Sequence, residues 1–423
     1  MLTPARRLRT RVSIFLLVVM ASCTSAPPRQ PPPEPVHETV VAGGLPDARF
    51  FADDLDEATR SRIEREMRAA LLTRWQAAGR PVAGLDVDML ALSGGGADGA
   101  FSAGLLTGWS ERGDRPEFDL VTGISVGALV APFAFLGSDD DDELRAIFTG
   151  LDTPDIAELR LFSALFGALS LARTDPLRAQ IERFVDDDFL ARIAAEHRKG
   201  RRLLVGTTNI DAARPVIWNM GEIAEAGELE LFKDVVLASA SIPGAFPPVE
   251  IEVEAGDHRY TELHVDGGVG HMVLIGPTRA ADALPQDLPF PVRRTIYVIM
   301  NVALVPPYQP VEDRLLAIVG RSLSTLIRAH SDGDLIRIYL AAGAAGADFR
   351  LTFLPPGFQA PPGSPFDRAY MTRLFETAYE EGRRGVTWLT EPPAIVGRRS
   401  IQGALGEAGS QARQRLPEDL EDE

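Results

Sequence analysis

The stretch FDLVTGISVGALVA, at residues 118–131, joins a short apolar run to a helical pattern through a G-x-S-x-G turn. Such a turn between a strand and a helix is typical of a nucleophile elbow. Its glycines, here Gly123 and Gly127, permit a sharp bend, and the serine hydroxyl then projects from the end of the sheet at a helix N-terminus. Ser125 is therefore the candidate nucleophile. Five-residue patterns also arise by chance, so a turn that simply buries a serine stays open at this point.

A second turn, SGGGADGA at residues 93–100, also follows an apolar run and precedes a helical pattern. Read as G-x-G-x-x-G, it matches the dinucleotide-binding fingerprint, which needs an acid at the end of the next strand. The acids Glu117 and Asp119 stand at the start of that strand instead, so pyrophosphate binding is disfavoured. Consecutive glycines before a helix also expose backbone N–H groups that can hold an oxyanion. The sequence thus predicts an oxyanion hole formed by Gly94, Gly95 and Gly96.

The third motif is Asp266-Gly267-Gly268, which closes the apolar run at residues 260–265. An aspartate at a strand end followed by two glycines can approach another loop closely, because no side chains intervene. Taken alone, the triplet D-G-G indicates only a turn. Beside a serine elbow it makes Asp266 a candidate general base.

These three motifs, in this order, resemble those of the patatin-like phospholipases. The motif glycines include Gly99, Gly267 and Gly268, and the stretches ASASIPGAFPPV (238–249) and TTNIDAARPVIWNMG (207–221) are similar as well. The resemblance implies a three-layer α/β/α fold with a mainly parallel sheet. It also implies hydrolysis of acyl esters in lipids by a Ser125–Asp266 dyad, with N–H groups of Gly95 and Gly96 in the oxyanion hole and without metal or cofactor.

One residue departs from that pattern. Many relatives have arginine or lysine where this chain has Asp98. A carboxylate aimed at a developing oxyanion would oppose catalysis. We therefore expect Asp98 to point away from the site and to cap the N-terminus of the following helix.

From residue 86 onward, short apolar runs alternate with helical patterns, which predicts an α/β domain with a mainly parallel sheet between helical layers. The expected strands are 87–93, 118–122, 202–209, 215–219, 260–265, 294–302 and 349–354. The expected helices are 99–112, 126–136, 141–149, 155–170, 176–198, 228–240, 312–343 and 367–388.

The N-terminus indicates export. Four arginines precede the apolar run at residues 12–20, which is too short to span a bilayer. The small residues Ala21 and Ser22 and then the sole cysteine, Cys23, follow this run, as in the lipobox of bacterial lipoproteins, although Met20 stands where that pattern usually has leucine. This resemblance implies acylation of Cys23 and a membrane-anchored protein of the cell envelope that faces the periplasm or the exterior. An ordinary secretory signal is the alternative.

The chain thereby divides into five predicted parts. They are a lipoprotein signal peptide (1–22), a proline-rich tether (23–50), an N-terminal amphipathic helix (51–85), the hydrolase domain (86–390) and an acidic, disordered tail (391–423).

The amino-acid composition argues against two kinds of ligand, nucleic acid and zinc. The net charge of −17 argues against nucleic acid, whose phosphates need a basic surface. One cysteine and the lack of H-E-x-x-H spacing among six histidines argue against a zinc site. We expect a lipid or phospholipid substrate and no cofactor. Two rivals remain: an esterase with a Ser–Asp–His triad that recruits His271 or His330, and a catalytically silent surface lipoprotein that only binds lipid.

Overall fold

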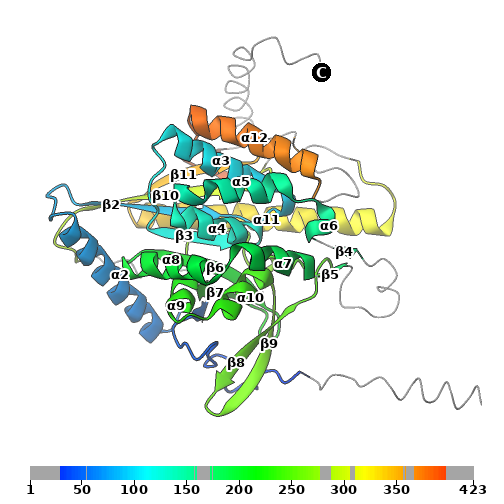
Figure 1. The fold of residues 1–423 in the computed structure, drawn as a ribbon, viewed down its shortest axis with the longest axis horizontal. Helices are drawn as coiled ribbons and strands as arrows, with labels where there is room; N and C mark the ends of the chain where they lie inside the picture. The colour runs from blue at the N-terminus through cyan, green and yellow to red at the C-terminus, as the bar shows by residue number, and fades with distance from the viewer. Residues whose placement is uncertain are drawn as a thin grey trace, which may run out of the picture.

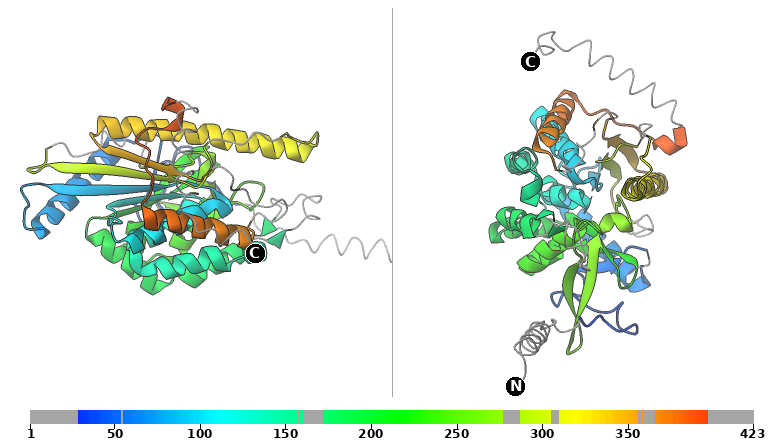
Figure 2. Two further views of the ribbon diagram at one scale, coloured as in Figure 1. Left: turned by 90° about the horizontal axis from the view of Figure 1, so that it is seen from above. Right: turned by 90° about the vertical axis from the view of Figure 1, so that its right-hand side faces the viewer.

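The computed structural model describes residues 29–53, 55–156, 158–159, 172–173, 175–276, 287–304, 310–355, 358 and 366–396. Helices cover both faces of a central nine-stranded sheet, which gives three layers (Figures 1 and 2). The fold predicted from the sequence, a three-layer α/β/α arrangement around a mostly parallel sheet, is confirmed.

The strands of the main sheet run in the order β1-β7-β6-β3-β2-β10-β11, with β9 also paired to β6 and β8 paired to β9. Five neighbours, β6, β3, β2, β10 and β11, are parallel, and the remaining pairs are antiparallel. The bounds are β1 Arg49–Phe51, β2 Leu85–Leu92, β3 Leu120–Ile124, β6 Arg202–Asn209, β7 Arg214–Asn219, β8 Val249–Ala255, β9 His258–Asp266, β10 Val292–Met300 and β11 Asp348–Phe353. A separate small pair joins β4 (Glu158–Leu159) to β5 (Ala172–Arg173).

The larger helical layer contains α3 (Gly99–Arg112), α4 (Val126–Leu136), α5 (Asp141–Gly150), α6 (Thr153–Ile156), α7 (Asp175–Phe184), α8 (Asp187–Arg198), α9 (Met220–Glu225), α10 (Leu229–Ser239) and α12 (Arg368–Arg384). The opposite face carries α2 (Glu57–Ala77) and the long α11 (Leu315–Ala344). Short turns of helix occur at Gly96–Asp98 (η1), Ser138–Asp140 (η2), Gly267–Val269 (η4) and Pro393–Val396 (α13). Figure 2 shows α11, in yellow, on one side of the sheet and the cyan, green and orange helices on the other.

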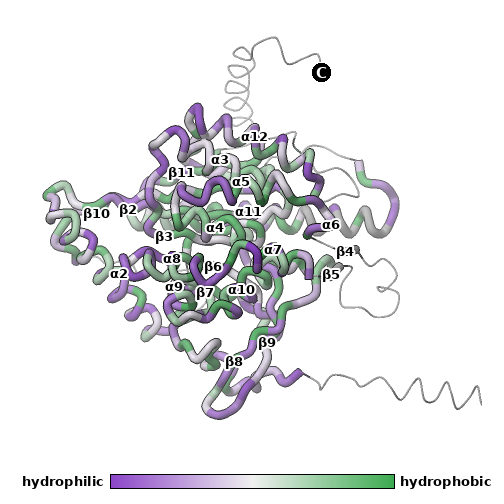
Figure 3. The backbone as a smooth tube through the Cα atoms, in the orientation of Figure 1, coloured by the Kyte–Doolittle hydropathy of each residue, from purple (hydrophilic) through white to green (hydrophobic). Residues whose placement is uncertain are grey.

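Strand β2 shows why the sheet needs a helical layer on each face. Its residues Leu90 and Leu92 belong to the core beneath α3 and α4, whereas Met89 and Ala91 belong to the core beneath α11. Side chains alternate between the faces of a strand, so an apolar run must be covered on both sides. Figure 3 shows this arrangement, with apolar segments inside and hydrophilic ones at the periphery.

All seven expected strands are present, each within two residues of its predicted ends. Two predicted helices differ. The one expected at 176–198 is divided into α7 and α8, because Asp186 accepts a hydrogen bond from the Phe189 N–H at 2.8 Å and so caps a new helix. The one expected at 155–170 ends at Ile156, and Glu158–Leu159 are a strand. The rest of that helix lies outside the described residues, as do the whole signal segment and most of the acidic tail.

Part of the segment predicted to be a tether is packed on the domain. Ala42 and Ala48 are fully buried, and β1 pairs with β7. The Arg49 side chain forms a buried ion pair with Glu262 of β9. No pattern in the sequence predicts this packing, because the stretch is rich in proline and its apolar residues are few.

Candidate active site

Ser125 lies between β3 and α4 in a backbone conformation that few residues other than glycine adopt, with φ 55° and ψ −124°. The turn is so tight that a Cβ atom on Gly127 would lie 2.5 Å from the Leu92 carbonyl oxygen of β2. One on Gly123 would lie 2.3 Å from the Gly127 carbonyl oxygen. The strained serine between two obligatory glycines has the geometry of a nucleophile elbow.

A second serine, which the sequence analysis did not single out, holds this turn. The buried Ser239 Oγ accepts a hydrogen bond from the Ser125 N–H at 3.0 Å and donates one to the Gly206 carbonyl at 2.7 Å. It therefore ties the elbow to β6 from the end of α10. The only hint of Ser239 in the sequence is the stretch at residues 238–249, which resembles the family but does not by itself assign a role to any one residue.

Asp266 ends β9, opposite Thr207 of β6. Its Oδ1 atom accepts a hydrogen bond from the Gly268 N–H at 2.7 Å. A Cβ on Gly267 would lie 2.4 Å from the Gly206 carbonyl oxygen, so glycine lets the Asp-Gly-Gly turn approach β6. The two glycines of this motif therefore have separate tasks. Gly267 permits the close backbone contact with β6, and Gly268 donates the hydrogen bond to Asp266.

The surroundings of Asp266 make its carboxylate a better proton acceptor than an exposed aspartate. Burial raises the pKa of this carboxyl from 3.8 to about 6, and interactions with the Ser125 hydroxyl and the Gly268 N–H counter that rise only in part. The buried Oδ2 atom makes no regular hydrogen bond within the described residues. The Ser125 hydroxyl therefore interacts with the carboxylate, although the two side chains form no hydrogen bond of regular geometry. Such loose geometry is common in catalytic groups before substrate binds.

The glycine loop lies directly beside the serine. A Cβ on Gly94 would lie 3.2 Å from Ser125 Cβ, and the Gly94 N–H is occupied by the Met272 carbonyl at 3.0 Å. Gly94 therefore supplies close approach and not a donor, which corrects its predicted place in the oxyanion hole. Gly95 precedes the η1 turn and Gly96 opens it with φ +60°, so neither N–H has an acceptor inside that turn.

Asn301, just after β10, positions this loop and was also missed. Its N–H donates to Ser93 Oγ at 2.8 Å and its side-chain amide donates to the Ser93 carbonyl at 2.9 Å. Its Oδ1 accepts from the Ser102 N–H at 3.1 Å. A Cβ on Gly95 would lie 2.3 Å from the Asn301 carbonyl oxygen. The available signal in the sequence is an asparagine near the end of the apolar run at residues 294–302, and the structure buries it fully.

Asp98 stands at the N-cap position of α3, as expected, but its side chain does not cap the helix. Its side chain makes no capping hydrogen bond to α3 and instead accepts one from the Tyr370 hydroxyl of α12. The side chain lies outside the pocket lining described below, as predicted. Burial raises the pKa of Asp98 to about 6, and the Tyr370 hydroxyl opposes that rise. Next to it, a Cβ on Gly99 would meet the Val126 side chain at 2.2 Å, so this motif glycine lets α3 approach α4.

No described histidine contacts the serine or Asp266. The buried His264 is hydrogen-bonded to Thr207 Oγ1 at 2.9 Å and to Glu262 at 3.1 Å. His271 is hydrogen-bonded to Asp334 of α11 at 2.9 Å, and His330 is exposed on the same helix. The histidines proposed for a triad thus have other partners or point to solvent.

Ser125 lines an apolar pocket. The pocket has a volume of about 950 Å³, counted out to open solvent, and extends along α4 past Leu129 and Phe133 toward Phe184 of α7 and Phe189 of α8. Among its described lining residues, only Ser125 and Gln180 have polar side chains. A pocket with so few polar groups suits an alkyl chain.

Several further predictions concern other parts of the chain. Cys23 lies outside the described residues. Within the described part, no three acidic, histidine or cysteine side chains are grouped as a metal site would need. Across the same ranges, no helix combines the length and the apolar character that crossing a bilayer requires.

Residues 90–279 match the family model of patatin-like phospholipases, and this region contains the elbow, the glycine loop and Asp266. Among solved structures, the chain is similar to VipD from Legionella pneumophila, with 14% identity, coverage of 72% of this chain and 67% of that one, and a TM-score of 0.35. It is also similar to the human GIVD cytosolic phospholipase A2, with 12% identity, coverage of 76% and 55%, and a TM-score of 0.28. No curated protein sequence matches the chain.

The position of Asp98 generates a prediction. Since burial raises its pKa from 3.8 to about 6, the ionised carboxylate destabilises the fold above about pH 6. The penalty, at most about 3 kcal/mol, disappears as the pH falls toward the unfolded value. Asp98→Asn should therefore raise the thermal midpoint at pH 8 but not at pH 4, and should keep turnover within about tenfold. The exposed Asp114→Asn is the control for thermal scans at both pH values. A several-hundredfold loss of turnover in folded Asp98→Asn would show that the carboxylate takes part in the site.

Proposed function

We propose that the chain is a lipid acyl hydrolase in which Ser125 is the nucleophile and Asp266 the general base. The observation that carries the proposal is the strained serine beside a buried carboxylate of raised pKa, at the mouth of an apolar pocket. The match of residues 90–279 to patatin-like phospholipases supports it.

In the first half of the proposed reaction, Asp266 removes the proton from the Ser125 hydroxyl while Oγ forms a bond to the ester carbonyl carbon. The carbonyl electrons move to the oxygen, which the N–H groups of Gly95 and Gly96 stabilise. When the tetrahedral intermediate collapses, the alcohol leaves with the proton that Asp266 holds. Water then repeats these steps on the acyl-serine, losing its proton to Asp266, and Ser125 recovers its hydrogen as the fatty acid departs.

Aspartate can serve as the base because its surroundings alter its acidity. An ordinary carboxylate is a weak proton acceptor, but exclusion of water disfavours its charge and raises its pKa. At pH 7, a group with a pKa of about 6 is still mostly ionised, so it can accept a proton. The apolar pocket would in turn hold the acyl chain of the substrate.

The dyad predicts that Ser125→Ala and Asp266→Asn each abolish ester hydrolysis without unfolding the protein. Single replacements of His258, His264, His271 and His330 should keep turnover within about tenfold, an effect of about 1.4 kcal/mol on the barrier. The measurements are turnover on phospholipids, neutral glycerides and short p-nitrophenyl esters, with circular dichroism as the folding control. A folded histidine variant as inactive as Ser125→Ala would overturn the dyad and favour a triad. Failure of a fluorophosphonate to label wild-type Ser125 would favour the silent lipid binder.

The pH dependence gives a second test of Asp266. Only the ionised carboxylate accepts a proton, so kcat/KM should rise with pH and reach half its plateau near pH 6. A histidine base would titrate in the same range. The temperature dependence of the pH midpoint distinguishes a carboxylate base from a histidine base. Ionisation of a carboxyl group is nearly athermal, whereas ionisation of an imidazolium absorbs heat. The midpoint should stay fixed on warming; a midpoint that falls steadily would contradict the assignment.

We also propose that Cys23 is acylated and anchors the chain to a membrane of the cell envelope. The support is the position of the sole cysteine directly after a basic segment and a short apolar run. Cys23→Ala should leave an unprocessed precursor that retains residues 1–22, whereas the wild-type protein should begin at a lipid-modified Cys23. Intact-mass spectrometry of membrane fractions distinguishes them. An unlipidated wild-type protein that begins at another residue excludes the anchor.

A further inference from the structure

A second hollow lies on the other face of the sheet, beneath α2 and the C-terminal end of α11. This groove has a volume of about 1340 Å³, counted out to open solvent. It is lined by the starts of β2, β3, β6 and β10, whereas the proposed active site lies beyond the ends of β2 and β3. The five residue steps from Leu120, at the start of β3, to Ser125, just beyond its end, span about 16 Å. The groove is therefore separate from the pocket at Ser125.

The floor of the groove is apolar. It is formed by strand residues that face α2 and α11, namely Val87, Met89, Leu120, Leu204 and Ile296. Helix α2 does not close over them: among its residues only Leu71 is buried, and Ile63 and Met67 line the groove while remaining partly exposed. Within the described residues, apolar surface of this extent is left open between the two helices, and such surface indicates a site that a ligand fills.

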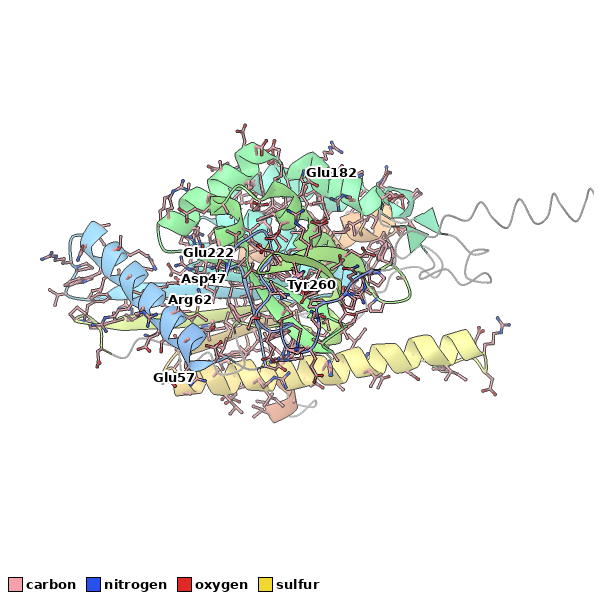
Figure 4. The ribbon with its side chains drawn as sticks, turned by 90° about the horizontal axis from the view of Figure 1, so that it is seen from below. Asp47, Glu57, Arg62, Glu182, Glu222 and Tyr260 are labelled. Atoms are coloured by element: carbon pink, nitrogen blue, oxygen red, sulfur yellow. The ribbon has the colours of Figure 1, made fainter. Side chains whose placement is uncertain are left out.

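Arginines surround this floor, although the chain as a whole is strongly acidic. Three of the four arginines that line the groove have acidic neighbours. Arg62 forms ion pairs with Asp47 at 2.9 Å and Glu66 at 3.1 Å, and Figure 4 shows Arg62 and Asp47 close together beside α2. Arg74 pairs with Asp119, and Arg202 lies 3.9 Å from Glu66.

The fourth arginine, Arg294, has no ion-pair or hydrogen-bond partner within the described residues, and burial alone lowers its pKa. It stands two residues before Ile296 on β10, so both side chains face the groove. The groove thus contains four guanidinium groups but three carboxylates, those of Asp47, Glu66 and Asp119. One anionic group on a ligand would complete this set.

We propose that the groove binds a fatty acid, with its carboxylate at Arg294 and its alkyl chain on the apolar floor. A planar guanidinium suits a carboxylate because it can donate two parallel hydrogen bonds. The floor supplies the apolar surface that an alkyl chain needs to leave water. The proposal does not depend on the chemistry assigned to Ser125, although a fatty acid is also the product that such chemistry releases.

The test is equilibrium dialysis of the full chain against radiolabelled dodecanoate below its micellar concentration. We expect Arg294→Gln to weaken one class of bound dodecanoate by about tenfold or more, since hydrogen bonds to charged groups are worth that much. Arg293→Gln is the matched control: its side chain is exposed on the opposite face of the strand and pairs with Asp86 at 2.6 Å. Ala341→Trp, which places an indole in the groove, should remove the same class. Leu129→Trp, in the pocket at Ser125, should leave it intact.

Dodecanol separates recognition of the carboxylate from burial of the chain, because it lacks the charge. It should bind this class more weakly than dodecanoate and should not respond to Arg294→Gln. Equal responses of the two arginine variants, or equal binding of alcohol and acid, would overturn the proposal. So would a dimer in sedimentation that Ala341→Trp dissociates, because a second copy would then occupy the groove. The readout is binding, so loss of esterase activity in Ser125→Ala leaves it interpretable.

Discussion

The close approach of the elbow to the end of β2 is the constraint on which the proposed active site depends. Gly127 fits against the Leu92 carbonyl only because it lacks a side chain, and this contact fixes the start of α4 relative to the glycine loop that follows β2. The backbone strain at Ser125 is balanced by neighbours, chiefly the hydrogen bond from its N–H to Ser239. The proposed nucleophile is thus held by backbone contacts on rigid elements, which is how precise positioning is ordinarily achieved.

The second determinant is electrostatic. Asp266 is fully enclosed and its Oδ2 atom lacks a regular hydrogen bond within the described residues, so the fold bears the cost of keeping a charge out of water. A rise in pKa from 3.8 to about 6 corresponds to about 3 kcal/mol at neutral pH. Asp98, in the neighbouring turn, has a similarly raised pKa but has Tyr370 as a partner and lies away from the pocket. Burial therefore raises the pKa of both carboxyls, although Asp266 is the proposed general base and Asp98 is a hydrogen-bond partner of Tyr370.

Much of this arrangement could be predicted from the sequence because it is local. The elbow, the glycine loop and the Asp-Gly-Gly turn each consist of adjacent residues whose types dictate a backbone shape, and the strands carry a strong apolar pattern. Ser239 and Asn301 escaped prediction because their partners are remote in the chain: Ser125 and Ser93 are 114 and 208 residues away. The occupied N–H of Gly94 and the contact of Asp98 with Tyr370 could not be predicted for the same reason. Strand β1 was missed because a three-residue strand with no alternation has no pattern of its own.

The glycine loop depends on Asn301 for its position, which affects the order in which the chain can assemble during synthesis. The loop is made early in synthesis, but the residue that holds it follows β10, in the last third of the polypeptide. Contacts between such distant segments form late, after most of the sheet has assembled. A chain still bound to the ribosome before residue 301 is made therefore contains Ser125 and Asp266 but lacks the residue that holds the loop proposed to bind the oxyanion. The proposed hydrolysis would accordingly have to wait until Asn301 has been made and has bound Ser93.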